Sequence, residues 1–206
     1  MAKQSSFGIC ESCGTRKGKA AMVTHLKQCL TTKGNKSALT PIMLLRVHQG
    51  PGSPYWLDVA APFDSKLDQL DGLLRRVWLE CCGHMSDFFA GRHNEVPASW
   101  RMTQAFGTVG DTLGYQYDFG STTELTVRFA GVGHAASRKP AVVARNEAPV
   151  WPCEDCGEPA ATICSECAWN GGGFCCAKHG EDHGCGEEML LPVVNSPRMG
   201  VCGYTG

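Results

Sequence analysis

The hydrophobic pattern in the middle of the chain predicts a β-hairpin. The segments "PIMLLRVHQ" (41–49) and "YWLDVAA" (55–61) are rich in apolar residues and have the length of strands. The sequence "GPGSP" between them is typical of a turn. We therefore expect two antiparallel strands joined at that turn.

A second strand pair is predicted further along the chain. The segments "YQYDFG" (115–120) and "TELTVRFA" (123–130) alternate apolar and polar residues, as half-buried strands do. Gly120 and Ser121 favour a turn between them.

Between the two strand pairs, the segment 63–82 has the period of a helix. Apolar side chains recur three or four positions apart, so they would share one face of the helix and pack on a sheet. These side chains are Leu67, Leu70, Leu74, Val77 and Trp78. Strands and helices in this arrangement predict the fold class α+β.

Charge and cysteine divide the chain into a front, a middle and a tail. The net charge is only −1, but seven basic residues and one acidic residue lie within the first 40 positions. From Trp151 onward, eight acidic residues stand against two basic ones. Eleven of the 13 cysteines lie in these two oppositely charged end segments.

The 206-residue chain, 43% hydrophobic and 19% charged, is long enough to bury a core. No segment approaches the roughly 20 apolar residues of a membrane span, and "MAKQSSFGIC" at the start lacks the apolar run of a signal peptide. We expect a cytoplasmic protein whose thiols stay reduced and available to metals.

The basic front has the ligand spacing of a zinc finger. Cys10 and Cys13 are two residues apart, at a turn that ends in "SCG". His25 and Cys29 are four residues apart in a segment with helical character, so both would face the same metal. The four side chains predict a closed Cys3His zinc site of structural type.

Three lysines beside this finger suggest contact with nucleic acid. Lys17, Lys19 and Lys27 lie on or just before the predicted helix, where DNA-binding fingers contact the duplex. A solvated basic face would show the same pattern, and one finger reads only about three base pairs.

The acidic tail carries four consecutive pairs of metal ligands. Joining the first pair to the third and the second to the fourth gives two tetrahedral zinc sites in a cross-brace. Cys175 is an alternative to Cys176, and closed thiolate sites argue against catalytic zinc. The predicted ligands are Cys153, Cys156, Cys176 and His179 in one site, and Cys164, Cys167, His183 and Cys185 in the other. With the finger, the chain would hold about three Zn2+ ions.

The middle of the chain holds two further cysteines with open interpretations. Cys81 and Cys82 end the predicted helix, and we expect them to pack in the core, because free cysteine is often buried. The alternatives are that these cysteines bind a metal or take part in redox chemistry, or that one of them is a nucleophile with His84 and Asp87 nearby. Cys202 is expected near the core, or as an alternative ligand. The remaining histidines, His48, His93 and His134, are isolated and are interpreted as ordinary polar residues.

Three segments resemble the plasmid pRiA4b ORF-3-like family, whose members often travel with plasmids and insertion elements. They are "LDGLLRRVWLECCGHMSDF" (70–88), "YQYDFGSTTELTVRF" (115–129) and "EEMLLPVVNSPRMGVCGYTG" (187–206). The resemblance runs from about Leu39 onward and implies an α+β domain without established chemistry. The catalytic serine and arginine pattern of a serine resolvase is missing from the sequence.

The expected domains are a zinc finger (1–38), an α+β domain (39–150), a two-zinc module (151–187) and a C-terminal segment that returns to the central domain (188–206). The expected function is non-enzymatic: the finger would contact DNA or RNA, and the acidic module would contact a protein partner. The alternative is a metal-dependent enzyme acting on nucleic acid, with an open site near Cys82, His84 and Asp87.

Overall fold

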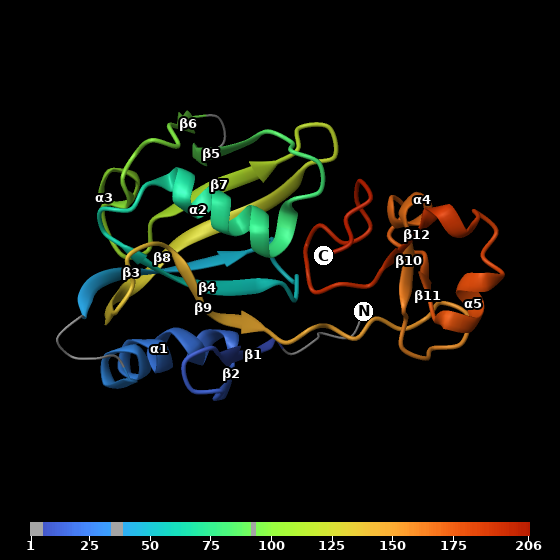
Figure 1. Cartoon of the computed structure of the whole chain (residues 1–206), viewed down its shortest axis with the longest axis horizontal. Helices are drawn as coiled ribbons and strands as arrows, with labels where there is room; N and C mark the ends of the chain where they lie inside the picture. Colours follow the sequence, from blue (N-terminus) through green and yellow to red (C-terminus); the bar gives the residue numbers. More distant parts are fainter. Residues whose placement is uncertain (1–5, 34–38, 92–93) are drawn as a thin grey trace. The chain divides into compact units, whose positions relative to one another are not determined.

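The computed structural model describes residues 6–33, 39–91 and 94–206. The chain forms two compact units, one made of 1–74 and 85–147 and the other of 75–84 and 148–206. Figure 1 shows a large sheet with helices in the first unit and a small sheet in the second. Within the described residues, no helix combines the length and apolar character that a membrane crossing requires.

The first unit is built on a nine-stranded antiparallel sheet with the order β2-β1-β9-β4-β3-β8-β7-β5-β6. Its strands are β1 (Phe7–Cys10), β2 (Arg16–Gly18), β3 (Thr40–His48), β4 (Trp56–Pro62), β5 (Ser86–Ala90), β6 (Asn94–Val96), β7 (Thr112–Tyr117), β8 (Thr123–Ala135) and β9 (Ala141–Asn146).

The two predicted strand pairs are confirmed. Strands β3 and β4 pair antiparallel from Ile42 opposite Pro62 to His48 opposite Trp56, and β7 and β8 pair from Thr112 opposite Arg128 to Tyr117 opposite Thr123. At the second turn Asp118 adopts a positive φ of 64°, and its Oδ1 accepts a hydrogen bond from the Gly120 backbone N–H at 3.0 Å. This local bond offsets the strain of a left-handed conformation at a residue that carries a Cβ.

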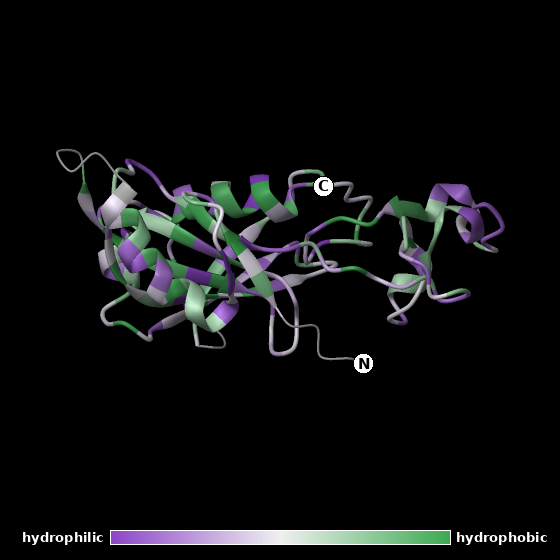
Figure 2. Ribbon diagram, turned by 90° about the horizontal axis from the view of Figure 1, so that it is seen from below, coloured by the Kyte–Doolittle hydropathy of each residue, from purple (hydrophilic) through white to green (hydrophobic). Residues whose placement is uncertain are grey.

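Helices cover both faces of the central strands. In β3, Ile42 and Leu44 pack with the residues of α1 (Lys19–Lys33), while the alternating Met43 and Leu45 are equally buried. The predicted second helix is present as α2 (Leu67–Leu74), which continues into a π-helical turn, η2 (Arg75–Leu79). Its amphipathic character is visible as alternating bands of hydropathy in Figure 2. A short helix, α3 (Met102–Ala105), completes this unit.

The second unit is small and has short elements. Its sheet has the order β11-β10-β12, with strands of only two or three residues. The elements are β10 (Thr162–Cys164), α4 (Ser165–Ala168), β11 (Phe174–Cys175), α5 (Ala177–Glu181), the 3-10 helix η3 (Glu187–Met189) and β12 (Leu190–Pro192).

Two of the expected domain boundaries differ from the structure. The front is not a separate domain of residues 1–38, because β1 pairs with β9 and places the finger segment in the large sheet. In the segment 188–206, β12 pairs with β10 in the second unit, while Ser196 and Cys202 contact Trp78 and Cys82 of the range expected for the central domain. Residues 34–38 of the expected linker, and His93, lie outside the described residues.

Candidate metal centres

The four predicted finger ligands come together in the first unit. Cys10 ends β1, Cys13 follows in a turn closed by Gly14 at a φ of 72°, and His25 and Cys29 lie one turn apart on α1. The ligand atoms of all four residues lie within 4.8 Å of one another.

Distances within this group match a zinc tetrahedron. Two sulfurs that each lie about 2.3 Å from a tetrahedral zinc are about 3.8 Å apart, and a sulfur and a ligating nitrogen are about 3.6 Å apart. The Sγ atoms of Cys10 and Cys29 are 3.9 Å apart, and Cys13 Sγ lies 3.3 Å from His25 Nε2. We take this Cys3His set as able to hold Zn2+.

The first predicted tail site also assembles. Cys153 and Cys156 flank a turn, while Cys176 and His179 lie at the start of α5 and within it. Cys156 Sγ and Cys176 Sγ are 3.8 Å apart, and His179 Nδ1 lies 3.4 Å from Cys153 Sγ and 3.5 Å from Cys176 Sγ.

The second tail site has the same composition. Cys164 ends β10, Cys167 lies in α4, and His183 and Cys185 follow α5. Cys167 Sγ is 3.8 Å from Cys185 Sγ and 3.6 Å from His183 Nε2. The four consecutive ligand pairs thus combine as in a cross-brace: the first and third pairs form one site, and the second and fourth pairs form the other.

The structure distinguishes Cys175 from Cys176. Cys176 belongs to the metal-ligand group, whereas Cys175 is buried outside it. Cys175 Sγ lies 3.7 Å from Nδ1 of His183, the ring nitrogen that does not face the other ligands of that site. Cys175 therefore contacts the predicted ligand His183 on the side of the ring away from the metal site.

Electrostatics in these groups favours a bound dication. In the finger group, the Thr15 hydroxyl and backbone lower the pKa of Cys13 to about 6, while burial and the neighbouring Cys13 and Cys10 thiols raise the pKa of Cys29 to about 12. The same contrast recurs within each tail site. In the first, backbone hydrogen bonding lowers the pKa of Cys153 to about 6, while burial and the Cys153 and Cys176 thiols raise the pKa of Cys156. In the second, hydrogen bonds from the backbone and His183 lower the pKa of Cys164 to about 7, while the Cys164 and Cys185 thiols raise the pKa of Cys167 to about 12. In each group one thiolate forms readily and a neighbouring thiol resists, so a central positive charge would favour deprotonation of all three thiols.

A fourth cysteine and histidine group lies in the second unit. The ligand atoms of Cys81, Cys82, His84 and Cys202 also lie within 4.8 Å of one another. The expectation that Cys81 and Cys82 pack in the core is wrong, because Cys82 is exposed and Cys81 only half-buried. Their helix ends with η2 at Leu79, so the next residues leave its buried face. Asp87 is in β5 and does not belong to the group.

Sequence reasoning did not assemble this group, because its ligands are far apart in the chain. Cys82 and His84 were expected only as an alternative, open metal site, and Cys202, which follows after more than a hundred residues, was not assigned to it. Among the described residues, four Cys/His groups could thus each hold a metal, where the sequence predicts about three.

Of the three lysines expected to contact nucleic acid, Lys17 and Lys27 are exposed, whereas Lys19 is half-buried. Lys17 is exposed on β2, but burial and the nearby Arg46 charge lower the pKa of Lys19. The side chain of Lys27 lies over Gly131 of β8, where an added Cβ would meet Lys27 Cε at 2.5 Å. The helix that a DNA-binding finger would present is thus packed on the sheet through Met22 and Leu26.

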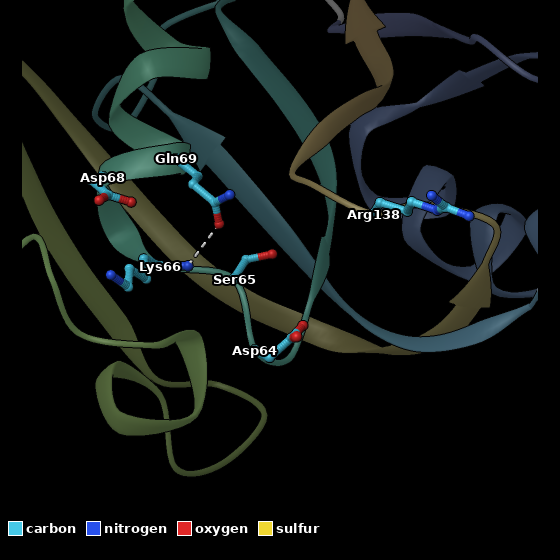
Figure 3. A pocket seen from close by; sticks show the side chains of 6 residues that line it. All are labelled: Asp64, Ser65, Lys66, Asp68, Gln69 and Arg138. Atoms are coloured by element: carbon cyan, nitrogen blue, oxygen red, sulfur yellow. Dashed lines mark hydrogen bonds between the residues drawn. The ribbon is translucent and has the colours of Figure 1, made fainter.

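A polar pocket of about 370 Å³ lies at the start of α2 (Figure 3). There Gln69 Oε1 accepts a hydrogen bond from the Lys66 backbone N–H at 3.0 Å, which caps the helix. Its other lining residues are Asp64, Ser65, Asp68 and Arg138. None of the residues that line this pocket belongs to the cysteine and histidine groups.

No family model and no curated protein matches the sequence. Among solved structures, the chain is similar to a protein of unknown function, MM3350, from Methanosarcina mazei Go1. The two are 16% identical with a TM-score of 0.45, and the match covers 51% of this chain and 68% of that one.

Proposed function

We propose that the chain is a zinc-stabilised binding protein and not an enzyme. The observation that carries the proposal is the composition of the predicted sites: each brings three thiols and one imidazole within 4.8 Å. Four protein ligands fill a zinc tetrahedron and leave no position for water or substrate, which is the pattern of a structural site. Zinc here would hold the fold, and function would reside on the surface.

The surface best suited to bind a partner lies on the acidic second unit. The eight acidic residues between 151 and 188 are all exposed. Trp169, which caps the C-terminal end of α4, has 68% of its surface exposed. Glu166 precedes Trp169 by three positions and lies on the same side of that helix turn. An exposed tryptophan among carboxylates suits a segment rich in arginine or lysine, because it offers both a cation–π face and charge complementarity.

The experiment is a fluorescence anisotropy titration of the zinc-loaded full chain. The probe is a labelled twelve-residue peptide of alternating arginine and serine, with a glutamate-for-arginine peptide as the control ligand. We expect binding of the basic peptide only, weaker at higher salt, and at least fivefold weaker for Trp169→Ala or Glu166→Lys.

The matched control is Trp100→Ala, because Trp100 is also exposed, at 38%, but lies in the other unit. Its affinity should equal that of the unmodified chain. Equal affinity of Trp169→Ala and the unmodified chain would refute the acidic docking surface. Binding of a DNA duplex that is lost in a Lys17→Glu and Lys27→Glu double variant would instead restore the nucleic-acid interpretation.

We also propose that the chain is related to the plasmid pRiA4b ORF-3-like family. In support, each of the three resembling segments falls on recognisable elements of the fold. The first covers most of α2, η2 and part of β5, the second covers most of the β7–β8 hairpin, and the third runs from η3 to the C-terminus. A solved family member with the same order of strands in its large sheet would test the relationship.

A further inference from the structure

We infer that Cys81, Cys82, His84 and Cys202 form a fourth zinc site, which ties the C-terminal segment to the end of the helix α2–η2. All four residues belong to the second unit, so the site lies within one compact body. The inference is independent of the proposed partner-binding surface.

The sulfur positions fit ligands that share one metal. Cys82 Sγ lies 3.8 Å from Cys81 Sγ and equally 3.8 Å from Cys202 Sγ. The equal spacing singles out neither cysteine as a disulfide partner of Cys82, and it equals the sulfur–sulfur edge of about 3.8 Å in a zinc tetrahedron. The same spacing occurs in the three groups predicted from the sequence.

The imidazole position also favours a ligand over a catalytic base. His84 Nε2 lies 3.0 Å from Cys82 Sγ and 3.2 Å from Cys202 Sγ. A base that activates one nucleophile faces one thiol. Here one nitrogen is shared almost evenly between two thiols, as it is when all three atoms surround a common ion.

A buried arginine side chain lies beside the group. Arg198 is fully buried, and its Nη2 lies 3.7 Å from Cys81 Sγ. One Zn2+ with three thiolates and a neutral imidazole has a net charge of −1. An N–H group directed at a metal-bound sulfur is a common contact around such centres, and this negative charge would attract the guanidinium.

The backbone is arranged to bring the ligands together. Cys202 adopts a positive φ of 51°, which is unusual for a residue with a side chain and persists where other interactions fix it. On the helix side, Gly83 has a φ of 81°, and its N–H donates to Glu80 Oε1 at 2.6 Å. Ser196 Oγ donates to the Trp78 carbonyl at 2.6 Å and holds the C-terminal segment beside the helix end.

The test is reconstitution of the full chain with Co2+, which reports tetrahedral thiolate sites by its absorption bands. We expect four cobalt ions per chain in the unmodified protein, three in Cys202→Ser, and four in Val109→Ser. Val109 is the control because its side chain is exposed and it belongs to none of the four groups. Three ions in both the unmodified protein and Cys202→Ser would overturn the inference.

A ligand exchange keeps the test decisive if Cys202→Ser does not fold. In His84→Cys, we expect four cobalt ions and a change of the visible bands toward those of a four-thiolate site. Unchanged bands would show that residue 84 does not ligate the metal and would overturn the inference. So would peptide mapping of the freshly prepared protein under non-reducing conditions, if it found Cys82 in a disulfide.

Discussion

At the scale of single residues, a buried ion pair stabilises the centre of the large sheet. Arg46 Nε and Nη2 donate to the two oxygens of Asp58 at 2.6 and 2.8 Å, and the Arg46 guanidinium stacks 4.7 Å from the Trp56 ring. Both partners are buried, with exposures of 8% and 1%. We predict that Asp58→Asn lowers the free energy of unfolding by roughly 3–5 kcal/mol, because it leaves a buried charge without its counter-charge. Urea denaturation of the zinc-loaded protein measures this.

The chain contains a matched control for that prediction. Arg16 and Glu147 form a bidentate pair of the same geometry, at 2.6 and 2.8 Å, but both side chains are exposed. Glu147→Gln should move the urea midpoint far less than Asp58→Asn, since water already screens the exposed pair. Equal shifts for the two variants would show that burial does not determine the strength of these pairs.

Residue-level prediction from the sequence succeeded where spacing is local. Cys10 and Cys13, or His25 and Cys29, can be assigned because a turn or a helix of known geometry separates them. Cys202 could not be assigned, because its partners are brought near by the tertiary fold and not by any local period. The Asp58 pair was missed for a different reason: Arg46 lies opposite Asp58 in the predicted hairpin, but the prediction did not include the register of the two strands.

At the scale of elements, strand β1 determines whether the finger is a part of the sheet. Gly8 lies on β1, and an added Cβ there would meet the Arg145 carbonyl oxygen and, at 2.6 Å, the Trp56 ring. We predict that Gly8→Ala destabilises the first unit by roughly 1–3 kcal/mol, because strand β1 must move away from β9. It should also weaken metal binding by the finger group, since Cys10 ends the same strand.

Gly18→Ala is the control, because no heavy atom lies within 4 Å of the position of its Cβ. Both variants are compared by urea denaturation and by competition for zinc with a chromophoric chelator. If Gly8→Ala lowered the stability of the sheet while the finger group kept its zinc affinity, the finger would be an independent domain, as residues 1–38 were expected to be.

The elements themselves could be predicted where their hydrophobic period was strong, and their long-range pairing could not. The β3–β4 and β7–β8 hairpins and helix α2 follow from runs of apolar residues and the turns between them. The pairing of β1 with β9 joins residues about 135 positions apart, and β12 has only three residues. Such pairings depend on which edge strand of a sheet still has unpaired backbone groups, and the hydrophobic pattern of the sequence does not reveal which edge that is.

At the scale of the whole molecule, the two units should differ in their dependence on metal. Of the four Cys/His groups among the described residues, the second unit contains three, and the strands of its sheet have two or three residues, so metal bound at these groups would supply much of its stability. The first unit has one group and a nine-stranded sheet with a large apolar core. None of the ligands at Cys81, Cys82, His84 and Cys202 is buried, whereas Cys10 and Cys29 are.

We therefore predict a stepwise response to a chelator, followed by hydrogen–deuterium exchange. Excess EDTA should first expose the backbone amides around Cys202, then those of β10 to β12, while β3, β4 and β8 stay protected. Added Zn2+ should restore protection, and Cys13→Ser should leave the exchange of the second unit unchanged, because that residue ligates only in the first unit. Simultaneous loss of protection in β3 and β10 would contradict the prediction, since it would mean that the large sheet also depends on metal and that its apolar core is insufficient to hold it.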